Sequence, residues 1–326
     1  MSDKMKAIIY KKYGSPDVLV PTELEKPAPE ASEVLIRVFA TTVTTADCMM
    51  RRGDTFLSRI LLGLFKPMRK FQIPGTEFSG KIEAVGNKVK KFKPGDEVFA
   101  FRGFGTGCYA QYKCMSETGS IAIKPRNISY EEAASVVDGA TTALFFLKEK
   151  ANIQKGQKVL INGASGSIGT FAVQLAKHFG AEVTGVCSTK NIDMVKSLGA
   201  DKVVDYTKED FVETGDTYDI IFDTVGKSSF AHCRKALKSN GKYVATVMNL
   251  KLIVQSILTK PGNKKKVIFA MSLNKTDALN FIRPLIEEGK LKTIIDRQYP
   301  LEGLPAAHEY VERGHKSGNV VITVAH

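Results

Sequence analysis

Three glycines at three-residue spacing, Gly163, Gly166 and Gly169, constrain this sequence more than any other feature. They follow the short apolar run KVLIN and precede a stretch whose apolar residues recur at helical spacing. A second apolar run, AEVTGVC, comes directly after that stretch. The sequence therefore predicts a strand, a tight turn, a helix and another strand within about thirty residues.

Glycine at such a turn can adopt positive φ values and lets a ligand approach the backbone without meeting a Cβ atom. The start of the following helix offers N–H groups and a partial positive charge to an anion. Ala164 stands where the usual G-x-G-x-x-G pattern has its first glycine, so a merely structural turn remains the alternative. We expect the pyrophosphate of a dinucleotide at this turn, which consists of Gly163, Ala164, Ser165, Gly166, Ser167, Ile168 and Gly169.

The alternation of strands and helices continues from about Ile128 to Met271, which predicts a doubly wound parallel sheet with helices on both faces. The first 120 residues contain short β-like runs, and the last fifty contain too few to form a core of their own. We expect the α/β fold to comprise a β-rich domain formed by residues 1–124 and 273–326, with residues 125–272 inserted as the dinucleotide-binding domain.

Composition excludes several other classes of protein. The formal charge of +13 is spread along the chain without a basic patch, so nucleic acid is not expected as a partner. Apolar stretches are too short for a membrane span, and no signal peptide is visible. The five cysteines form no C-x-x-C pair, which favours reduced thiols and a cytoplasmic location.

The choice of nicotinamide cofactor depends on the residues after the second strand. An NAD-selective site holds the adenosine ribose with an acidic residue about twenty positions after the glycines. Here the stretch from Val183 to Ile192 contains no acid. Side chains that can donate to a 2′-phosphate stand there instead, which favours NADP(H) over a solvent-facing polar loop; they are Ser188, Thr189, Lys190 and Asn191.

Taken together, these segments resemble the medium-chain dehydrogenase/reductase superfamily, specifically its zinc-free quinone oxidoreductase-like branch. The resemblance is carried by GTEFSGKIEAVGNKVKKFKPGDEV, KVLINGASGSIG, LGADKVVDYTKEDF and HKSGNVVITV, and covers essentially the whole chain. It implies a GroES-like catalytic domain, a Rossmann domain and a substrate cleft at their junction. It also implies a homodimer formed through the last sheet strand, near Lys266 to Met271.

Alcohol-oxidising members of this superfamily hold zinc with Cys and His in the first domain. In this sequence Thr76 replaces the His of their G-H-E motif, and no Cys occurs between Thr42 and Asp47. No histidine precedes His178. We therefore expect no bound metal, which makes alcohol oxidation less favoured than reduction of an acceptor that delocalises the incoming charge.

The resulting hypothesis is hydride transfer from NADPH to a quinone or an α,β-unsaturated carbonyl compound. Reduction of enoyl thioesters is less favoured, since Asp54-Thr55-Phe56 lacks the tyrosine of those relatives. A non-catalytic NADPH-binding sensor or structural protein is the alternative from another class.

The resemblance also suggests roles for individual residues. Thr44 is expected to contact the acceptor oxygen and Asp47 to position a water, with ordinary turn capping as the alternative for both. Tyr109 either donates a proton or packs. Further contacts with the cofactor are expected from Thr142, Tyr206, Asp223, Val225, Gly226, Gly318 and Asn319.

Overall fold

The computed structural model describes residues 4–54, 59–60, 62–246, 254–256 and 265–326. The chain forms two compact units. The first unit comprises residues 1–138, 273–287 and 294–326, and the second comprises residues 139–272 and 288–293. The first unit is therefore built from both ends of the chain.

Six parallel strands form the sheet of the second unit, in the order β10-β9-β8-β11-β12-β13. Numbered along the chain this order is 3-2-1-4-5-6, which is that of a Rossmann fold, so the predicted doubly wound sheet is confirmed. The strands are β8 (Lys158–Asn162), β9 (Glu182–Cys187), β10 (Lys202–Asp205), β11 (Tyr218–Asp223), β12 (Leu237–Ala245) and β13 (Lys266–Phe269).

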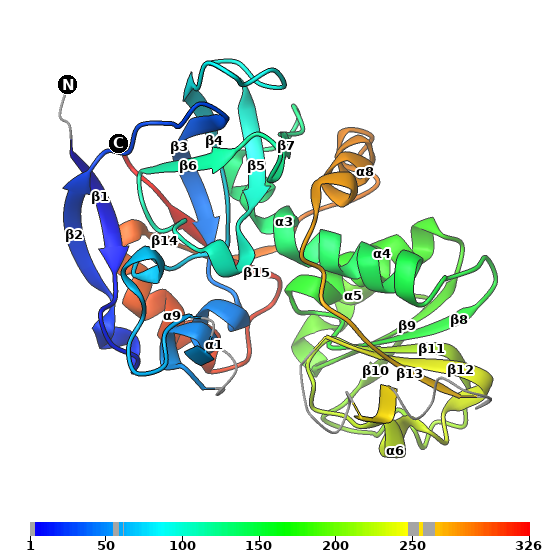
Figure 1. Ribbon diagram of the computed structural model, residues 1–326. Coiled ribbons are helices and arrows are strands. Elements are labelled where there is room, and N and C mark those ends of the chain that lie inside the picture. The colour runs from blue at the N-terminus through cyan, green and yellow to red at the C-terminus, as the bar shows by residue number, and fades with distance from the viewer. Residues whose placement is uncertain (1–3, 55–58, 61, 247–253, 257–264) are drawn as a thin grey trace. The chain divides into compact units, whose positions relative to one another are not determined.

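Helices cover both faces of this sheet: α4 lies on one face and α6 on the opposite face (Figure 1). Phe171, Ala172 and Leu175 of α4 are fully buried, as the helical spacing of the sequence predicts. The strand β8 is buried because both faces of the sheet are covered, which explains its uninterrupted apolar run. The helices are α4 (Ser167–His178), α5 (Ile192–Ser197) and α6 (Phe230–Cys233).

The helix α3 (Tyr130–Leu144) passes from the first unit into the second. Its start is fixed by a capping box, in which Ser129 Oγ accepts from the Glu132 N–H at 3.1 Å and the Glu132 carboxylate accepts from the Ser129 N–H at 2.8 Å. The helix α3 continues directly into a π-helical turn over Phe145–Lys150.

The sheet of the first unit contains seven strands in the order β14-β15-β3-β4-β5-β7, with β6 paired to β3. They are β3 (Glu33–Thr42), β4 (Glu77–Val85), β5 (Glu97–Phe101), β6 (Tyr112–Ser116), β7 (Ser120–Ile123), β14 (Ile295–Pro300) and β15 (Asn319–Thr323). The hairpin β1 (Lys4–Ile9) and β2 (Val20–Glu25) completes the strands, and the helices are α1 (Thr45–Arg52), α8 (Thr276–Glu287) and α9 (Leu304–Glu312).

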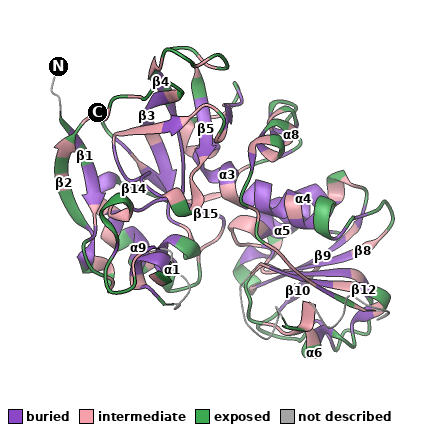
Figure 2. Ribbon diagram, viewed as in Figure 1, coloured by how far each residue is buried: buried purple, intermediate pink, exposed green. Residues whose placement is uncertain are grey.

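The strand β3 is the centre of this sheet, because it pairs with β4, β6 and β15. Val34, Leu35, Ile36 and Val38 are all buried (Figure 2), and three of them belong to a core cluster that also contains Leu301, Leu304 and Val320 from the end of the chain. Among the described residues, no helix is long and apolar enough to cross a bilayer.

Candidate functional site

The glycine turn forms a tight cradle at the carboxyl end of β8. Gly163 has φ +84°, and a Cβ atom there would lie 2.1 Å from Val225 Cγ2. A Cβ atom on Gly169 would lie 2.0 Å from the Gly163 carbonyl oxygen. Both positions therefore require glycine, so that the helix can pack closely on the strand. The turn lies between β9 and β11, where the strand order reverses and ligands bind in such sheets.

Gly166 is the N-cap of α4 and provides no side-chain cap. The Thr170 N–H donates to the Gly166 carbonyl oxygen at 2.9 Å, which marks the start of the helical bonding. A helix N-terminus carries a partial positive charge, and its first N–H groups have no intrahelical partner. A Cβ atom on Gly166 would contact only the Gly163 carbonyl oxygen, at 3.5 Å. The cradle therefore fits the pyrophosphate of a dinucleotide, with Ala164, Ser165, Ser167 and Ile168 completing the turn.

Ser188 to Asn191 form a short turn at the carboxyl end of β9, where the sequence places the adenosine phosphate. Asn191 is buried, and its amide donates to Ser188 Oγ at 3.3 Å, so these two side chains hold one another. Lys190 is exposed on the same turn. Tyr206 is also exposed, and its N–H donates to the Cys187 carbonyl oxygen at 3.1 Å, which brings it beside this turn.

The Thr189 hydroxyl donates to the Asp205 carboxylate, so its proton is already committed within the protein. Asp205 also accepts from the Thr207 hydroxyl at 2.7 Å and the Thr207 N–H at 3.0 Å. These hydrogen bonds, with Thr189 first, hold the pKa of Asp205 at about 2. A negative charge thus lies beside a loop whose own sequence contains no acid. The sequence analysis did not identify this charge, although Asp205 directly follows the apolar pair of a predicted strand, a place where polar site residues often occur.

Asp223 organises the loop that follows β11. One carboxylate oxygen accepts from the N–H groups of Val225 and Gly226, at 3.1 and 3.0 Å. The other accepts from the Tyr243 hydroxyl at 2.9 Å. Asp223 is fully buried, so it shapes this loop, and Val225 of the loop lies against Gly163. Thr142, in α3, is buried at 8% exposure.

In the first unit, Thr44 and Asp47 form a capping box at the start of α1. Thr44 Oγ1 accepts from the Asp47 N–H at 3.1 Å, while Asp47 Oδ2 accepts from the Thr44 N–H at 2.9 Å and the Thr44 hydroxyl at 2.6 Å. The capping that the sequence offered as an alternative is therefore present. Thr44 is half-buried, whereas Asp47 is 1% exposed, and burial raises the pKa of Asp47 to about 6.

A second buried carboxyl, that of Glu77, lies at the start of β4. It forms hydrogen bonds with the Thr42 hydroxyl and the Asp138 N–H. Burial first, and then the nearby carboxylate of Asp138, raise the pKa of Glu77 to about 8. The sequence alone did not indicate that this carboxyl group is buried.

The residues around Asp47 and Glu77 do not fit a zinc ion. Thr76, at the position of the family's ligand histidine, donates to Asp47 Oδ2 at 3.5 Å. The cluster thus offers hydroxyl and carboxyl groups that already bond to one another, whereas zinc in these enzymes takes thiolate and imidazole ligands. No group of three potential metal ligands occurs among the residues that the structure describes.

Tyr109 is fully buried in the same unit, and its hydroxyl donates to the Thr42 carbonyl oxygen at 3.0 Å. Burial raises its pKa well above 10. Its ring also lies against Gly75, where a Cβ atom would be 2.8 Å from Tyr109 Cδ1. These contacts support packing rather than proton donation.

Cys48 and His308 form a buried pair that the sequence did not reveal, with 3.4 Å between Sγ and Nδ1. Burial raises the pKa of the Cys48 thiol and lowers that of His308 to about 3. Both groups are therefore neutral at pH 7. The pair packs α1 against α9 and has no thiolate nucleophile.

Gly318 and Asn319 lie at the start of β15. Gly318 has φ +82°, and a Cβ atom there would lie 2.3 Å from the Ile294 carbonyl oxygen. The Asn319 N–H and side-chain amide both donate to that oxygen, at 2.9 and 3.2 Å. These residues fix the backbone where the last strand begins, and the structure shows no further role for them.

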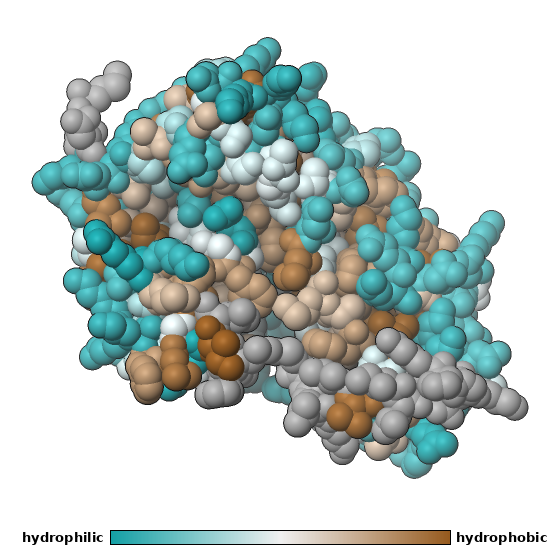
Figure 3. Space-filling model, viewed as in Figure 1, coloured by the Kyte–Doolittle hydropathy of each residue, from teal (hydrophilic) through white to brown (hydrophobic). Residues whose placement is uncertain are grey.

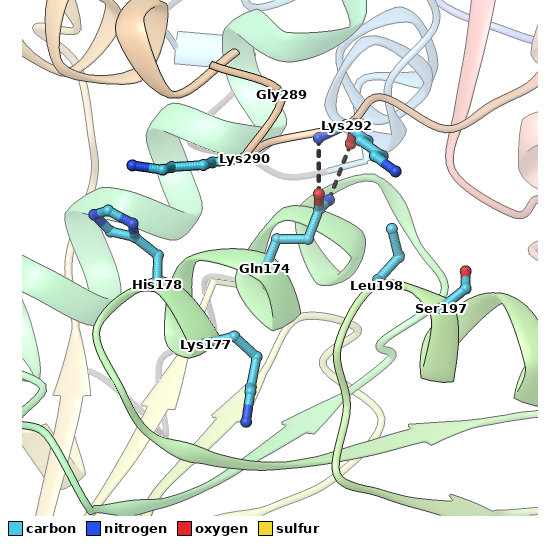
Figure 4. Close-up of a pocket in the computed structure, with 8 residues that line it drawn as sticks. All are labelled: Gln174, Lys177, His178, Ser197, Leu198, Gly289, Lys290 and Lys292. Atoms are coloured by element: carbon cyan, nitrogen blue, oxygen red, sulfur yellow. Dashed lines mark hydrogen bonds between the residues drawn. The ribbon is translucent and has the colours of Figure 1, made fainter. Parts of the chain in front are cut away.

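A separate pocket of about 350 Å³ lies in the second unit at the opposite end of α4 (Figure 4). The Gln174 amide exchanges two hydrogen bonds with the backbone of Lys292, at 2.7 and 2.9 Å, which ties the segment 288–293 to the helix. Gln174, the pocket residue nearest the start of α4, lies seven residues after Ser167, which is about 10 Å along the helix axis at about 1.5 Å per residue. This pocket is therefore not part of the cradle.

Comparison with known proteins agrees with this geometry. Residues 30–126 match a family described as alcohol dehydrogenase GroES-like domain, and residues 198–322 match one described as zinc-binding dehydrogenase. The chloroplastic quinone-oxidoreductase QR1 of Triphysaria versicolor is 32% identical over 98% of both chains. The chloroplastic NADPH-dependent alkenal/one oxidoreductase of Arabidopsis thaliana is also 32% identical, over 98% of this chain and 79% of its own.

Among solved structures, the quinone oxidoreductase from Coxiella burnetii superposes with a TM-score of 0.89 at 29% identity, covering 99% of this chain and all of its own. The chain therefore belongs to the medium-chain dehydrogenase/reductase superfamily, among its quinone oxidoreductase-like members, and is an oxidoreductase.

Proposed function

We propose that the protein transfers hydride from NADPH to a quinone or an α,β-unsaturated carbonyl compound without a bound metal. The polar cluster around Asp47 and Glu77 is the observation that carries this proposal, because threonines stand where alcohol-oxidising relatives hold zinc. The names of the relatives from Triphysaria and Arabidopsis support the acceptor class. Such acceptors spread the incoming charge over a conjugated system, so a Lewis acid is not required.

When bound, the nicotinamide supplies the hydride. The residues of the chain bind and orient it: the cradle at Gly163 to Gly169 holds the pyrophosphate, and Asp223 fixes Val225 and Gly226 beside it. In the first unit, Thr44 is half-buried and is the less buried member of the pair that it forms with Asp47. We assign to the Thr44 hydroxyl a hydrogen bond to the acceptor oxygen, for which it gives up its donation to Asp47 Oδ2. The Asp47 carboxyl has a pKa near 6, so the fraction that is protonated can then donate to Thr44 Oγ1.

Selectivity for NADP(H) is assigned to the turn after β9. Ser188 and Lys190 can donate to a 2′-phosphate, with Asn191 holding Ser188 and Tyr206 lying alongside. The Thr189 hydroxyl contributes indirectly, because it donates its hydrogen bond to the Asp205 carboxylate. Lys190 therefore supplies the positive charge that offsets both the phosphate and the nearby Asp205 carboxylate.

We also propose that two chains pair through β13. This strand is the edge of the second unit's sheet, and Met271, just beyond it, is 46% exposed. Light scattering on the purified protein tests for the dimer.

The nucleotide-binding domain is assigned to residues 125–272, and NADPH binding by that fragment tests its bounds. A cytoplasmic location is proposed from the five free cysteines, and cell fractionation tests it.

The test measures binding of NADPH and NADH by fluorescence, followed by NADPH oxidation with benzoquinones, naphthoquinones, alkenals, cyclic enones and enoyl thioesters. Lys190→Ala should weaken NADPH binding about tenfold and leave NADH binding unchanged, because only NADPH carries the 2′-phosphate. Gly166→Ala should fold normally, since its Cβ has room, but lose affinity for both cofactors.

The outcomes separate the alternatives. Oxidation of NADPH by a quinone or alkenal supports the proposal. Tight NADPH binding with every acceptor inert would instead identify a non-catalytic NADPH-binding protein. Equal affinity for NADH and NADPH would refute the assignment of the turn after β9.

A further inference from the structure

The chain between α1 and β4 presents apolar and cationic side chains together at the surface of the first unit. Phe65 is 87% exposed, Leu64 is 44% exposed and Met68 is 41% exposed. Lys66, Arg69 and Lys70 are exposed among them. We call residues 64–70 the tip segment. On the face shown in Figure 3, brown residues gather at the lower left, in the region of α1 and the chain that follows it in Figure 1.

The tip segment is held in place by contacts on both sides. The Met68 N–H donates to the Leu62 carbonyl oxygen at 2.8 Å, which closes a short loop with Phe65 near its apex. Leu62 is fully buried, and the Tyr13 hydroxyl donates to the Gly63 carbonyl oxygen at 2.6 Å. These contacts fix the backbone of the loop, while its apolar side chains remain exposed to solvent.

Along the sequence, the charged residues in and next to the tip segment have one sign. The sequence contains no Asp or Glu from Thr55 to Thr76, while Arg59, Lys66, Arg69 and Lys70 fall within this stretch. Cations that alternate with exposed Phe, Leu and Met side chains are typical of segments that bind the interface of an anionic bilayer. A protein partner is less favoured, because cations interrupt the exposed apolar residues, so that these do not form one continuous apolar run.

We propose that the tip segment docks the protein onto the surface of an anionic phospholipid bilayer, with Phe65 and Leu64 inserted among the lipids and Lys66, Arg69 and Lys70 facing the headgroups. This attachment is peripheral. It is independent of the proposed hydride transfer, so either proposal can fail without the other.

The experiment sediments the full chain with vesicles of phosphatidylcholine containing about one third phosphatidylglycerol, and with vesicles of phosphatidylcholine alone. We expect binding to the anionic vesicles, at least about tenfold weaker binding to the neutral ones, and release by high salt. The double variant Phe65→Ser/Leu64→Ser should reduce binding about tenfold or more with an unchanged melting temperature, because both side chains face solvent.

Charge is tested with a matched pair of variants. Lys66→Gln/Lys70→Gln should weaken binding several-fold, whereas Lys88→Gln/Lys90→Gln removes the same charge from exposed positions elsewhere and should bind like the wild type. The proposal is overturned if the wild type binds neither vesicle, or if both pairs weaken binding equally, which would indicate only the general charge of +13. Binding that survives the Phe65 and Leu64 substitutions would also overturn it.

Discussion

Replacing Glu77 by glutamine should remove one component of the pH dependence of stability near neutrality, namely a loss of stability as the pH rises. Glu77 is buried and its pKa is raised from 4.5 to about 8, so the folded chain keeps a proton that the unfolded chain has released. A carboxyl group whose pKa is raised by folding lowers the free energy of unfolding as pH rises from its unfolded pKa to its folded pKa. The window for Glu77 is therefore pH 4.5 to 8.

Within this window nearly one proton separates the two states, which corresponds to about 1.4 kcal/mol per pH unit. Between pH 5.5 and 7.5 the wild type should lose about 2.5 kcal/mol relative to Glu77→Gln. The glutamine amide keeps one acceptor oxygen in place of the two carboxyl oxygens, so its altered hydrogen bonds with Thr42 and Asp138 should cost about 1–3 kcal/mol at every pH. The test therefore compares how steeply the free energy of unfolding changes with pH in the two proteins, and not its absolute value.

The measurement is urea unfolding at several pH values from 5.5 to 7.5, with Glu23→Gln as a matched control. The Glu23 side chain is 65% exposed, so the control curve should run parallel to that of the wild type. If wild type and Glu77→Gln lose stability at the same rate with pH, the Glu77 carboxyl is not protonated in the folded protein and the reasoning fails.

Three further predictions concern the cradle, the turn after β9 and the thiols. Gly169→Ala should lower the free energy of unfolding by about 1–3 kcal/mol, because its Cβ meets backbone at 2.0 Å; chemical unfolding measures this, and wild-type stability would show that the helix can shift freely. Asp205→Asn should tighten NADPH binding several-fold at low salt and leave the affinity for NADH nearly unchanged, since it removes a negative charge beside Thr189. Equal changes in affinity for both cofactors in fluorescence titrations would argue against this. Four cysteines are buried, and burial raises the pKa of Cys108 to about 12 and that of Cys114 to about 11. A disulfide reagent at pH 7 should therefore label the native chain slowly, and should label five thiols once the chain is unfolded. Rapid labelling of the native chain would contradict the described burial.

The fold could be predicted from the sequence because its strongest signals are local. The glycines at 163, 166 and 169 must lie between a strand and a helix, and the alternation that follows leaves few topologies for a parallel sheet. The burial of β3 could not be predicted, because it depends on β15 and β6, which come from distant parts of the chain.

The site was less predictable, because its side chains are paired through tertiary contacts. Asp205 reaches Thr189 only because β10 lies parallel to β9 with Asp205 opposite Cys187. The carboxylate of Asp223 accepts hydrogen bonds from its own loop, which the sequence could not indicate, and its expected contact with the cofactor stays a prediction. The type of a residue indicates what it can bond to, whereas the fold determines which partner it has.

The central claim is that a nicotinamide cofactor reduces the acceptor here without a bound cation. The most direct measurement combines the zinc content of the purified protein with its rate of NADPH oxidation by a quinone before and after treatment with a chelator. We predict substoichiometric zinc and an unchanged rate. One tightly held zinc ion per chain, with a rate that is lost on its removal and restored on its return, would contradict the claim.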